Sequence, residues 1–298
     1  MDKAEWIAVD WGTSTLRLWA MQGDRVLAER RGDDGMGRLD PGQYEPTLLR
    51  HAEDWLTPGR VTEVLVCGMA GARTGWHEAP YRPVPCTPAG PGAVSVDTAD
   101  PRLSVRILPG LSQARPADVM RGEETQIAGF LASRPRFDGV LCLPGTHTKW
   151  VQISAGEVVS FRTFMTGELF ALLSTQSVLR LSVAPGGSDA AVFRQALGDA
   201  ISRPESLASA LFSLRAAHLL EGQDPVAARA RLSGLLIGLE LAGARPWWLG
   251  AQVVLIGAAG VTDPYRAALA EQGLTAEVVS GESMVLAGLC AARTGDLA

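Results

Sequence analysis

The sequence of 298 residues lacks the features that mark several specialised classes of protein. Its four cysteines, at positions 67, 86, 142 and 290, form no C-x-x-C pair, so the sequence indicates neither a zinc site nor a disulfide framework. No apolar run reaches the roughly 18 residues of a membrane span, and the N-terminus lacks the basic and then apolar layout of a secretory signal. We therefore expect a cytoplasmic protein with no membrane partner.

Clusters of positive charge are also missing. The formal net charge is -5 and no run of Lys or Arg occurs, which argues against a nucleic-acid partner. Four sequence motifs are absent: G-x-x-x-x-G-K-[ST], G-x-G-x-x-G, H-E-x-x-H and G-x-S-x-G. The sequence therefore gives no motif support for a P-loop, the usual dinucleotide site, a zincin or a nucleophile elbow.

The patterns that are present predict a layered α/β protein, because strands alternate with helices. A Pro-rich and aromatic segment over 72–92 is expected to be an ordered loop. The length allows two domains, which we place at residues 1–118 and 119–298. We expect strands within 7–30 and from Val61, Val105 and Val140, and helices over 43–57, from Arg121, and over 189–201, 204–221 and 225–243. A strand, a Gly-Ala-Ala-Gly turn, a helix capped by Asp263, and a last strand and helix follow.

An internal repeat links two parts of the chain. The stretch "IAVDWGTSTLRLWAMQGDRVLAE" from Ile7 aligns without a gap on "VLCLPGTHTKWVQISAGEVVSFRTF" from Val140, at an offset of 133 residues. Each copy reads as strand, loop, strand, turn and strand, and each loop has the pattern Gly-Thr-x-Thr. Since repeats of this kind mark duplicated structure, we expect two similar domains.

The two loops are predicted to bind phosphate, because backbone N–H groups in a tight turn and adjacent hydroxyls form an anion-binding concavity. Asp10 stands at the base of the first loop, where the second copy has Leu143, and a lone carboxylate fits a single Mg²⁺ site. A turn-forming role is the alternative for Asp10, and simple surface solvation is the alternative for Lys149. The candidate phosphate ligands are Gly12, Thr13, Ser14 and Thr15 in the first copy and Gly145, Thr146, His147, Thr148 and Lys149 in the second.

Several motifs carry a family resemblance. "VDWGTST", "LPGTHTKW" and "LIGAAG" resemble the two phosphate motifs and the adenosine motif of the sugar kinase, Hsp70 and actin superfamily. More closely, "GMAGARTGWHEAPY", "ILPGLS", "VMRGEETQIAG", "LPGTHTKWV" and "FMTGELFALL" resemble the 2-dehydro-3-deoxygalactonokinase family, over nearly the whole chain.

This resemblance implies a two-domain actin-like ATPase (ribonuclease H-like) fold with a duplicated β-hairpin phosphate-binding core. It implies ATP and Mg²⁺ as cofactors and ATP-dependent phosphorylation of 2-dehydro-3-deoxy-D-galactonate to its 6-phosphate, in D-galactonate catabolism. It also implies that Gly257, Ala258 and Gly260 approach adenine and ribose. Another sugar or sugar acid as acceptor, or a non-catalytic actin-like ATP-binding regulator, are the alternative functions, and a homodimer is possible.

Phosphoryl transfer needs a carboxylate that accepts the proton of the acceptor hydroxyl. Glu123 and Glu124 are the candidates, and because adjacent helical residues project about 100° apart, we expect only one to serve. Matching "GEE" to the "GDQ" helix start of sugar kinases implies Glu123, although those kinases have Asp there. Stabilisation of the helix N-terminus is the alternative role for both acids.

A keto-acid substrate carries a carboxylate, and bidentate arginine is the usual partner of such a group. Arg73, in the aromatic loop, and Arg121, just before the acidic pair, are the candidates. Trp76 and Tyr81 are candidates for walls of the sugar site, with plain packing as the alternative. Spacing alone assigns no role to residues 165–168.

Overall fold

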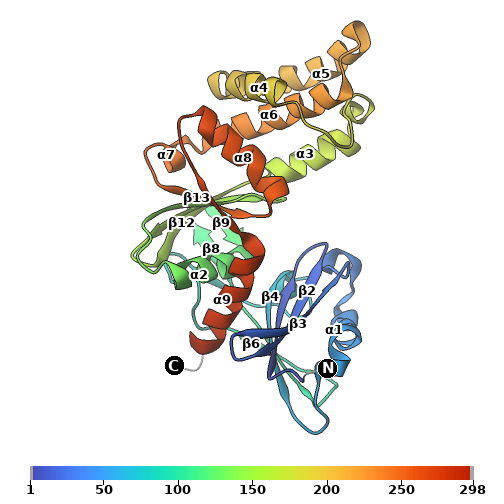
Figure 1. Ribbon diagram of the computed structural model, residues 1–298, viewed down its shortest axis with the longest axis vertical. Coiled ribbons are helices and arrows are strands. Elements are labelled where there is room, and N and C mark those ends of the chain that lie inside the picture. The colour runs from blue at the N-terminus through green and yellow to red at the C-terminus, as the bar shows by residue number, and fades with distance from the viewer. Residues whose placement is uncertain (1–2, 296–298) are drawn as a thin grey trace. The chain divides into compact units, whose positions relative to one another are not determined.

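The computed structural model describes residues 3–295, which form two mixed sheets of similar order and a small third sheet (Figure 1). The first sheet has the order β3-β2-β1-β4-β7-β6 and the second has the order β12-β11-β10-β13-β14. The first contains β1 (Trp6–Trp11), β2 (Leu16–Gln22), β3 (Arg25–Gly32), β4 (Thr62–Gly68), β6 (Val94–Val96) and β7 (Leu103–Ile107). The second contains β10 (Gly139–Leu143), β11 (Thr148–Ser154), β12 (Glu157–Phe164), β13 (Val253–Gly257) and β14 (Glu277–Ser280).

The predicted repeat appears as two equivalent groups of strands. β1 to β3 and β10 to β12 occupy nearly the same positions at the offset of 133 residues. In each sheet the inner strand of this group then pairs in parallel with later strands, β1 with β4 and β10 with β13. The two tight turns use left-handed backbone at Gly23 (φ 53°) and at Gly156 (φ 79°), a conformation that glycine adopts readily. The duplicated core is therefore confirmed.

The strands β1, β2 and β4 of the first sheet are buried on both faces, and successive side chains along each strand point to opposite faces. Ile7 and Val9 of β1 pack in one core cluster with α1 (Tyr44–Ala52), whereas Trp6 and Ala8 pack in a second cluster with α9 (Gly281–Gly295). The strands β2 and β4 repeat this alternation. The end of β1, where Asp10 lies, is thus held between two hydrophobic layers.

Helix α2 (Glu123–Ser133) packs closely on α9, since a Cβ added at Gly129 or Gly288 would collide with backbone of the other helix. The described residues divide into two compact units, each with most of its contacts within itself. The described parts of residues 1–137, 153–161 and 281–298 form the first unit, and residues 138–152 and 162–280 form the second. The expected boundary at residue 118 lies inside β9 (Ala117–Met120). The division into domains 1–118 and 119–298 stays a prediction.

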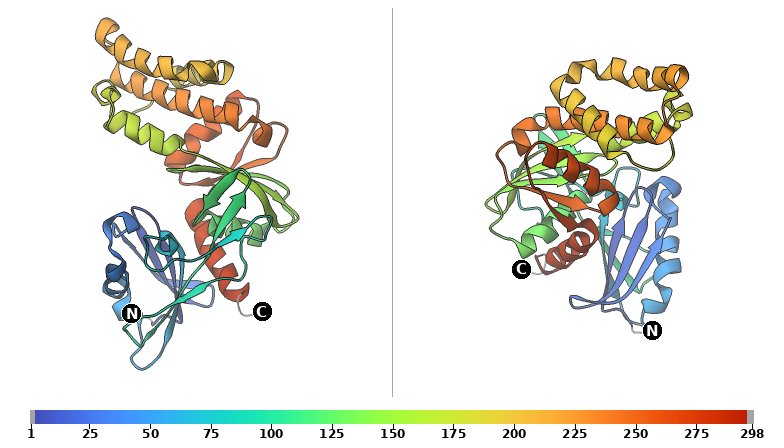
Figure 2. Two further views of the ribbon diagram at one scale, coloured as in Figure 1. Left: turned by 180° about the vertical axis from the view of Figure 1, so that it is seen from behind. Right: turned by 45° about the horizontal axis from the view of Figure 1, so that its top comes forward.

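The second unit carries most of the helices. These are α3 (Thr166–Thr175), α4 (Ala190–Ser202), α5 (Leu207–Glu221), α6 (Pro225–Gly243), α7 (Arg245–Trp248) and α8 (Ala259–Glu271). Figure 2 shows the yellow-to-orange helices α4, α5 and α6 side by side. Gly234 and Gly238 bring α6 against α4, because a Cβ at Gly238 would lie 2.7 Å from the carbonyl oxygen of Leu197. No helix of residues 3–295 is long and apolar enough to cross a membrane.

Two features differ from the sequence-based expectation. Asp263 is not a helix cap: α8 begins at Ala259 with Ala258 as its cap, so Asp263 and Pro264 lie inside the helix. The Ala258 carbonyl accepts hydrogen bonds from the N–H groups of Val261 and Thr262, which starts the helix one turn earlier than the Asp-Pro signal suggests. The aromatic loop contains an unpredicted strand, β5 (Tyr81–Pro83), which joins β8 (Gly110–Ala114) and β9 in the third sheet.

Candidate active site

The first candidate phosphate loop joins β1 to β2. The N–H of Gly12 donates to the Thr15 carbonyl at 2.9 Å, while Thr13, Ser14 and Thr15 are exposed. A segment that sequence analysis missed supports this loop: the Gly37 N–H donates to the Thr13 carbonyl at 2.9 Å, and a Cβ at Gly35 would collide with Ser14. The only signal for this support was the closely spaced glycines of "DDGMGR".

The second candidate loop joins β10 to β11 and is supported in the equivalent way. Gly145, Thr146 and His147 are exposed. The N–H of Glu168 donates to the Thr146 carbonyl at 2.9 Å, and a Cβ at Gly167 would collide with the Gly145 carbonyl oxygen. The His147 ring lies 2.5 Å, Nε2 to Oε2, from the Glu168 carboxylate. Within residues 165–168, which spacing left without a role, Gly167 and Glu168 therefore hold this loop in place.

The last two candidates of the second loop turn inward. The Thr148 hydroxyl is fully buried and lies 2.8 Å from the Tyr265 hydroxyl. Lys149 is only 4% exposed, so simple surface solvation was the wrong alternative for it. Backbone and hydroxyl groups of Gly145, Thr146 and His147 are thus the part of this loop that is accessible to a phosphate.

Asp10 is engaged by an arginine from the opposite strand. The Arg17 guanidinium donates to one Asp10 oxygen through Nε, at 3.0 Å, and through Nη2, and it also lies 3.5 Å from Glu282. Burial raises the pKa of Asp10, while the charge of Arg17 opposes this shift and that of Glu123 adds to it. Arg17 is therefore a partner of the candidate metal ligand and not a plain surface residue.

The surroundings of Asp10 limit the kind of metal site that could form there. Within residues 3–295, no three His, Cys, Asp or Glu side chains gather as a metal site. The second Asp10 oxygen faces the Cys67 thiol at 3.8 Å, so it is not saturated by strong donors. These residues fit Mg²⁺ held by one carboxylate, water and substrate phosphate, which is common for this ion.

The structure separates the two acids at the start of α2. Glu124 is buried, and its carboxylate accepts the Gly122 N–H at 2.7 Å and the Thr125 hydroxyl at 3.2 Å. Burial, together with the charge of Glu123, raises the pKa of Glu124 to about 7. Glu123 is partly exposed, and its charge acts on Asp10.

The backbone before these acids is compact. Gly122 has a φ of 104°, and a Cβ there would lie 3.4 Å from the Cα of Gly68, the last residue of β4. A Cβ at Gly68 would itself lie 3.4 Å from the nearer carboxylate oxygen of Asp10. The positive φ of Gly122 therefore starts α2 beside the ends of β1 and β4.

The candidate substrate-binding side chains differ in how exposed they are. Trp76 stacks on Tyr44, with ring centroids 5.9 Å apart, and belongs to the core packing. Arg121 is 9% exposed, lies over the Tyr81 ring at 4.3 Å, and donates to the Ala79 carbonyl at 2.7 Å. Its Nη1 has no hydrogen-bond partner among residues 3–295. Arg73 is exposed on the loop.

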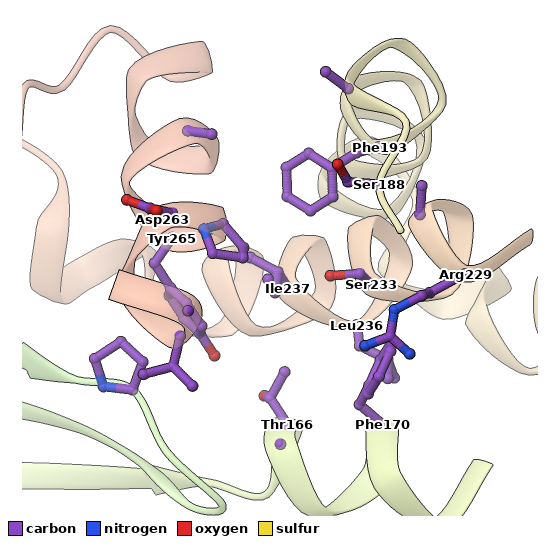
Figure 3. Close-up of a pocket in the computed structure, with 18 of the residues that line it drawn as sticks. Thr166, Phe170, Ser188, Phe193, Arg229, Ser233, Leu236, Ile237, Asp263 and Tyr265 are labelled. Carbon is purple, nitrogen blue, oxygen red and sulfur yellow. The ribbon is translucent and has the colours of Figure 1, made fainter. Parts of the chain in front are cut away.

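A cavity of about 680 Å³ lies beside the second loop. This volume is within the range of small-molecule sites. Gly145 and Thr146 line it together with Gly260, in the first turn of α8. Gly257 and Ala258 come just before that turn. Figure 3 shows further lining side chains: Phe170 of α3, which lies in the "FMTGELFALL" motif, and Ser188, Phe193, Arg229 and Ser233, which no quoted motif contains.

Comparison with known proteins decides the family. The sequence model of the 2-keto-3-deoxy-galactonokinase family matches residues 10–292. The chain belongs to this family. It is 43% identical to a probable 2-dehydro-3-deoxygalactonokinase of Rhizobium meliloti (strain 1021), over 96% of this chain and 95% of that one. It is 35% identical to a 2-dehydro-3-deoxygalactonokinase of Escherichia coli (strain K12), over 96% of each chain.

Solved structures agree with this membership. A proposed 2-dehydro-3-deoxygalactonokinase from Sinorhizobium meliloti is 41% identical and superposes with a TM-score of 0.89, covering 97% of this chain and 98% of that one. Component A of an (R)-2-hydroxyglutaryl-CoA dehydratase from Acidaminococcus fermentans, 15% identical, has a TM-score of 0.53 over 98% and 99% of the two chains. The latter likeness concerns the fold alone, and the predicted two-domain actin-like ATPase fold is confirmed.

Proposed function

We propose that this chain is a kinase that transfers the terminal phosphoryl group of ATP to the terminal hydroxyl of 2-dehydro-3-deoxy-D-galactonate. The product is the 6-phosphate, as D-galactonate breakdown requires. The observation that carries the proposal is the cavity bordered by the second phosphate loop and the first turn of α8, in a chain of this kinase family. A helix N-terminus and a glycine loop together favour a phosphate-bearing ligand.

The nucleotide is assigned to this cavity. Gly145 and Thr146, which line the cavity, would contact the phosphate chain, and Gly260 would let the ligand approach the start of α8. The exposed His147 would contact the phosphate chain from the same loop. Thr148 and Lys149, whose side chains are buried, would support the loop from beneath. The apolar rings of Phe170 and Phe193 line the cavity and would pack against the base, with the polar side chains of Ser188, Arg229 and Ser233 beside them (Figure 3).

The acid-base chemistry is assigned to the first unit. Glu123 would accept the proton of the acceptor hydroxyl, because it is partly exposed and lies close enough to Asp10 to shift its pKa. Glu124 would instead hold Gly122 in its left-handed conformation through the backbone N–H. Asp10 would hold Mg²⁺, which neutralises charge on the phosphates when bound. The exposed hydroxyls of Thr13, Ser14 and Thr15 would contact phosphate oxygens beside it.

The substrate carboxylate is assigned to Arg73, which is exposed on the aromatic loop. Arg121 is too deeply buried to bind the substrate carboxylate in a bidentate way. It would instead hold Tyr81 and Ala79 in place, through its contact with the ring and its hydrogen bond to the carbonyl. Tyr81, 39% exposed, would form a wall of the sugar site, and Trp76 would support the loop. The cytoplasmic location, the homodimer and the boundary at residue 118 stay predictions.

The test is an assay that couples ADP release to turnover, with Mg-ATP and a panel of acceptors. The panel contains 2-dehydro-3-deoxygalactonate, its gluconate epimer and neutral hexoses. Turnover should be confined to the galactonate-derived acid. The Arg73→Gln variant should have a KM for this acid at least about tenfold higher than wild type, because it loses a charge-assisted hydrogen bond. Turnover of neutral hexoses, or of none of the panel, would contradict the proposed substrate.

A further inference from the structure

A buried carboxylate that the proposed chemistry does not use lies beneath the second loop. Glu240 of α6 is 1% exposed. Its Oε1 accepts the Trp150 indole N–H at 2.8 Å, and its Oε2 accepts the Tyr265 hydroxyl at 2.7 Å and the Thr166 hydroxyl. Burial raises the pKa of Glu240, and the three donors oppose that shift. A carboxylate buried this deeply is costly unless such donors satisfy it.

The residues of this network other than Glu240 come from three separate elements of the second unit. Because the Tyr265 hydroxyl gives its one proton to Glu240, the Thr148 hydroxyl must be the donor in its 2.8 Å bond to Tyr265. Thr148 and Trp150 belong to β11, Thr166 begins α3 and Tyr265 lies on α8. Glu240 is thus the common acceptor that fixes these elements on α6.

Two of these donors also border the cavity. Thr166 and Tyr265 both line it, and Figure 3 shows the Tyr265 ring descending from α8 with its hydroxyl toward the Thr166 side. Thr166 directly precedes Gly167 and Glu168, the residues that hold the loop at Gly145 and Thr146. Thr148 immediately follows the exposed part of that loop. Glu240 therefore holds side chains of the cavity wall, and it also holds Thr166 and, through Tyr265, Thr148, which lie next to the loop and to the segment that supports it.

We propose that Glu240 is a positioning residue for the nucleotide, which ties the second phosphate loop to the wall of the adenosine cavity. This inference rests on the proposed function, since it takes the cavity to be the nucleotide site. Glu240 has no contact with the ligand and acts through Thr166, Tyr265 and Thr148. Its removal should weaken nucleotide binding without a matching effect on the sugar acid.

The test compares three variants by calorimetric titration with Mg-ADP and, separately, with the sugar acid. Glu240→Gln keeps the size of the side chain but replaces one acceptor oxygen by a donor, so the Kd for ADP should rise about tenfold, the cost of one charge-assisted bond. Tyr265→Phe keeps the ring in the wall and should raise this Kd in the same direction. Trp150→Phe is the matched control, because Trp150 gives the same carboxylate a hydrogen bond but does not line the cavity.

All three variants should lose thermal stability, but only the first two should lose ADP affinity, and Trp150→Phe should stay within about twofold of wild type. If Glu240→Gln does not fold, Tyr265→Phe against Trp150→Phe makes the same comparison. Equal losses of ADP affinity in all three variants, or a wild-type Kd in Glu240→Gln and Tyr265→Phe, would overturn the role of Glu240 but leave the nucleotide assignment in place. Wild-type protein that binds no ADP would overturn the nucleotide assignment, and the inference with it.

Discussion

The two copies of the β-hairpin share the same backbone arrangement, but the charged pair beside the first loop has no counterpart at the equivalent positions of the second. In both, a glycine-bearing segment supports the loop, and the equivalent carbonyls of Thr13 and Thr146 accept its backbone N–H. The first copy places Asp10 opposite Arg17, and at the offset of 133 residues the second copy has Leu143 and Trp150. The backbone of the loop is therefore retained while its charged pair is not.

This difference indicates how the two units divide the work. The first unit has two carboxylates near the first loop, Asp10 in the hairpin itself and Glu123 at the start of α2, where they could act on a metal ion and an acceptor hydroxyl. In the second unit the carboxylate of Glu240, on α6, is buried and is bonded to other side chains, so it can only hold these side chains in place. We infer that nucleotide affinity depends mainly on the second unit and proton transfer on the first.

The largest effect on stability is expected from Gly167→Ala, which disrupts the support of the second loop. The added Cβ would collide with the Gly145 carbonyl oxygen, so the loop or α3 must move. We expect a stability loss of about 1–3 kcal/mol, as for other overpacked sites, measured by urea unfolding. The Kd for Mg-ADP should rise about tenfold in a binding titration.

Two controls sharpen this prediction. Gly198→Ala, in an exposed part of α4 with no atom within 4 Å of its added Cβ, should be neutral or stabilising. Gly35→Ala disturbs the equivalent support of the first loop and should lower stability and turnover while changing ADP affinity less than Gly167→Ala does. Equal ADP affinities in wild type and Gly167→Ala would contradict the division of work.

A smaller and pH-dependent effect is expected from Glu124→Gln. The pKa of Glu124 is raised to about 7 from its ordinary 4.5, so the folded protein holds this proton more tightly than the unfolded chain. Wild-type stability from this group is full below about pH 4.5 and is lost as pH rises through about 7. The Tm of Glu124→Gln relative to wild type should therefore increase by a few degrees between about pH 5 and about pH 8. Parallel Tm curves would show that the raised pKa is wrong.

The smallest effect distinguishes the last threonine of each loop. Thr148→Val removes a buried hydroxyl that is bonded to Tyr265, and it should cost about 1 kcal/mol in urea unfolding. Thr15→Val changes an exposed side chain and should alter stability by less than about 0.5 kcal/mol. The same free energy of unfolding for both variants would mean that the two hydroxyls occupy similar environments.

Much of the fold could be predicted because the repeat and the largely apolar runs of β1, β2 and β4, which are buried on both faces, are visible in the local sequence. The start of α8 could not, because Asp263 and Pro264 imitate a helix cap, whereas the hydrogen bonds to the Ala258 carbonyl begin the helix earlier. Sequence also left Glu123 and Glu124 unresolved, since only burial separates them. The network of Glu240 escaped notice because its members come from distant segments and no motif spacing joins them.

The most direct test of the central claim is the paired measurement of kcat and of the Kd for Mg-ADP in Glu123→Gln, with Glu124→Gln as the matched control. If Glu123 is the base and the nucleotide is held by the second unit, kcat should fall by roughly 10²–10⁴ while the Kd stays within about twofold of wild type. Glu124→Gln should keep at least about a tenth of the wild-type kcat. A Glu123→Gln enzyme with near wild-type kcat, or a larger loss in Glu124→Gln than in Glu123→Gln, would contradict the account.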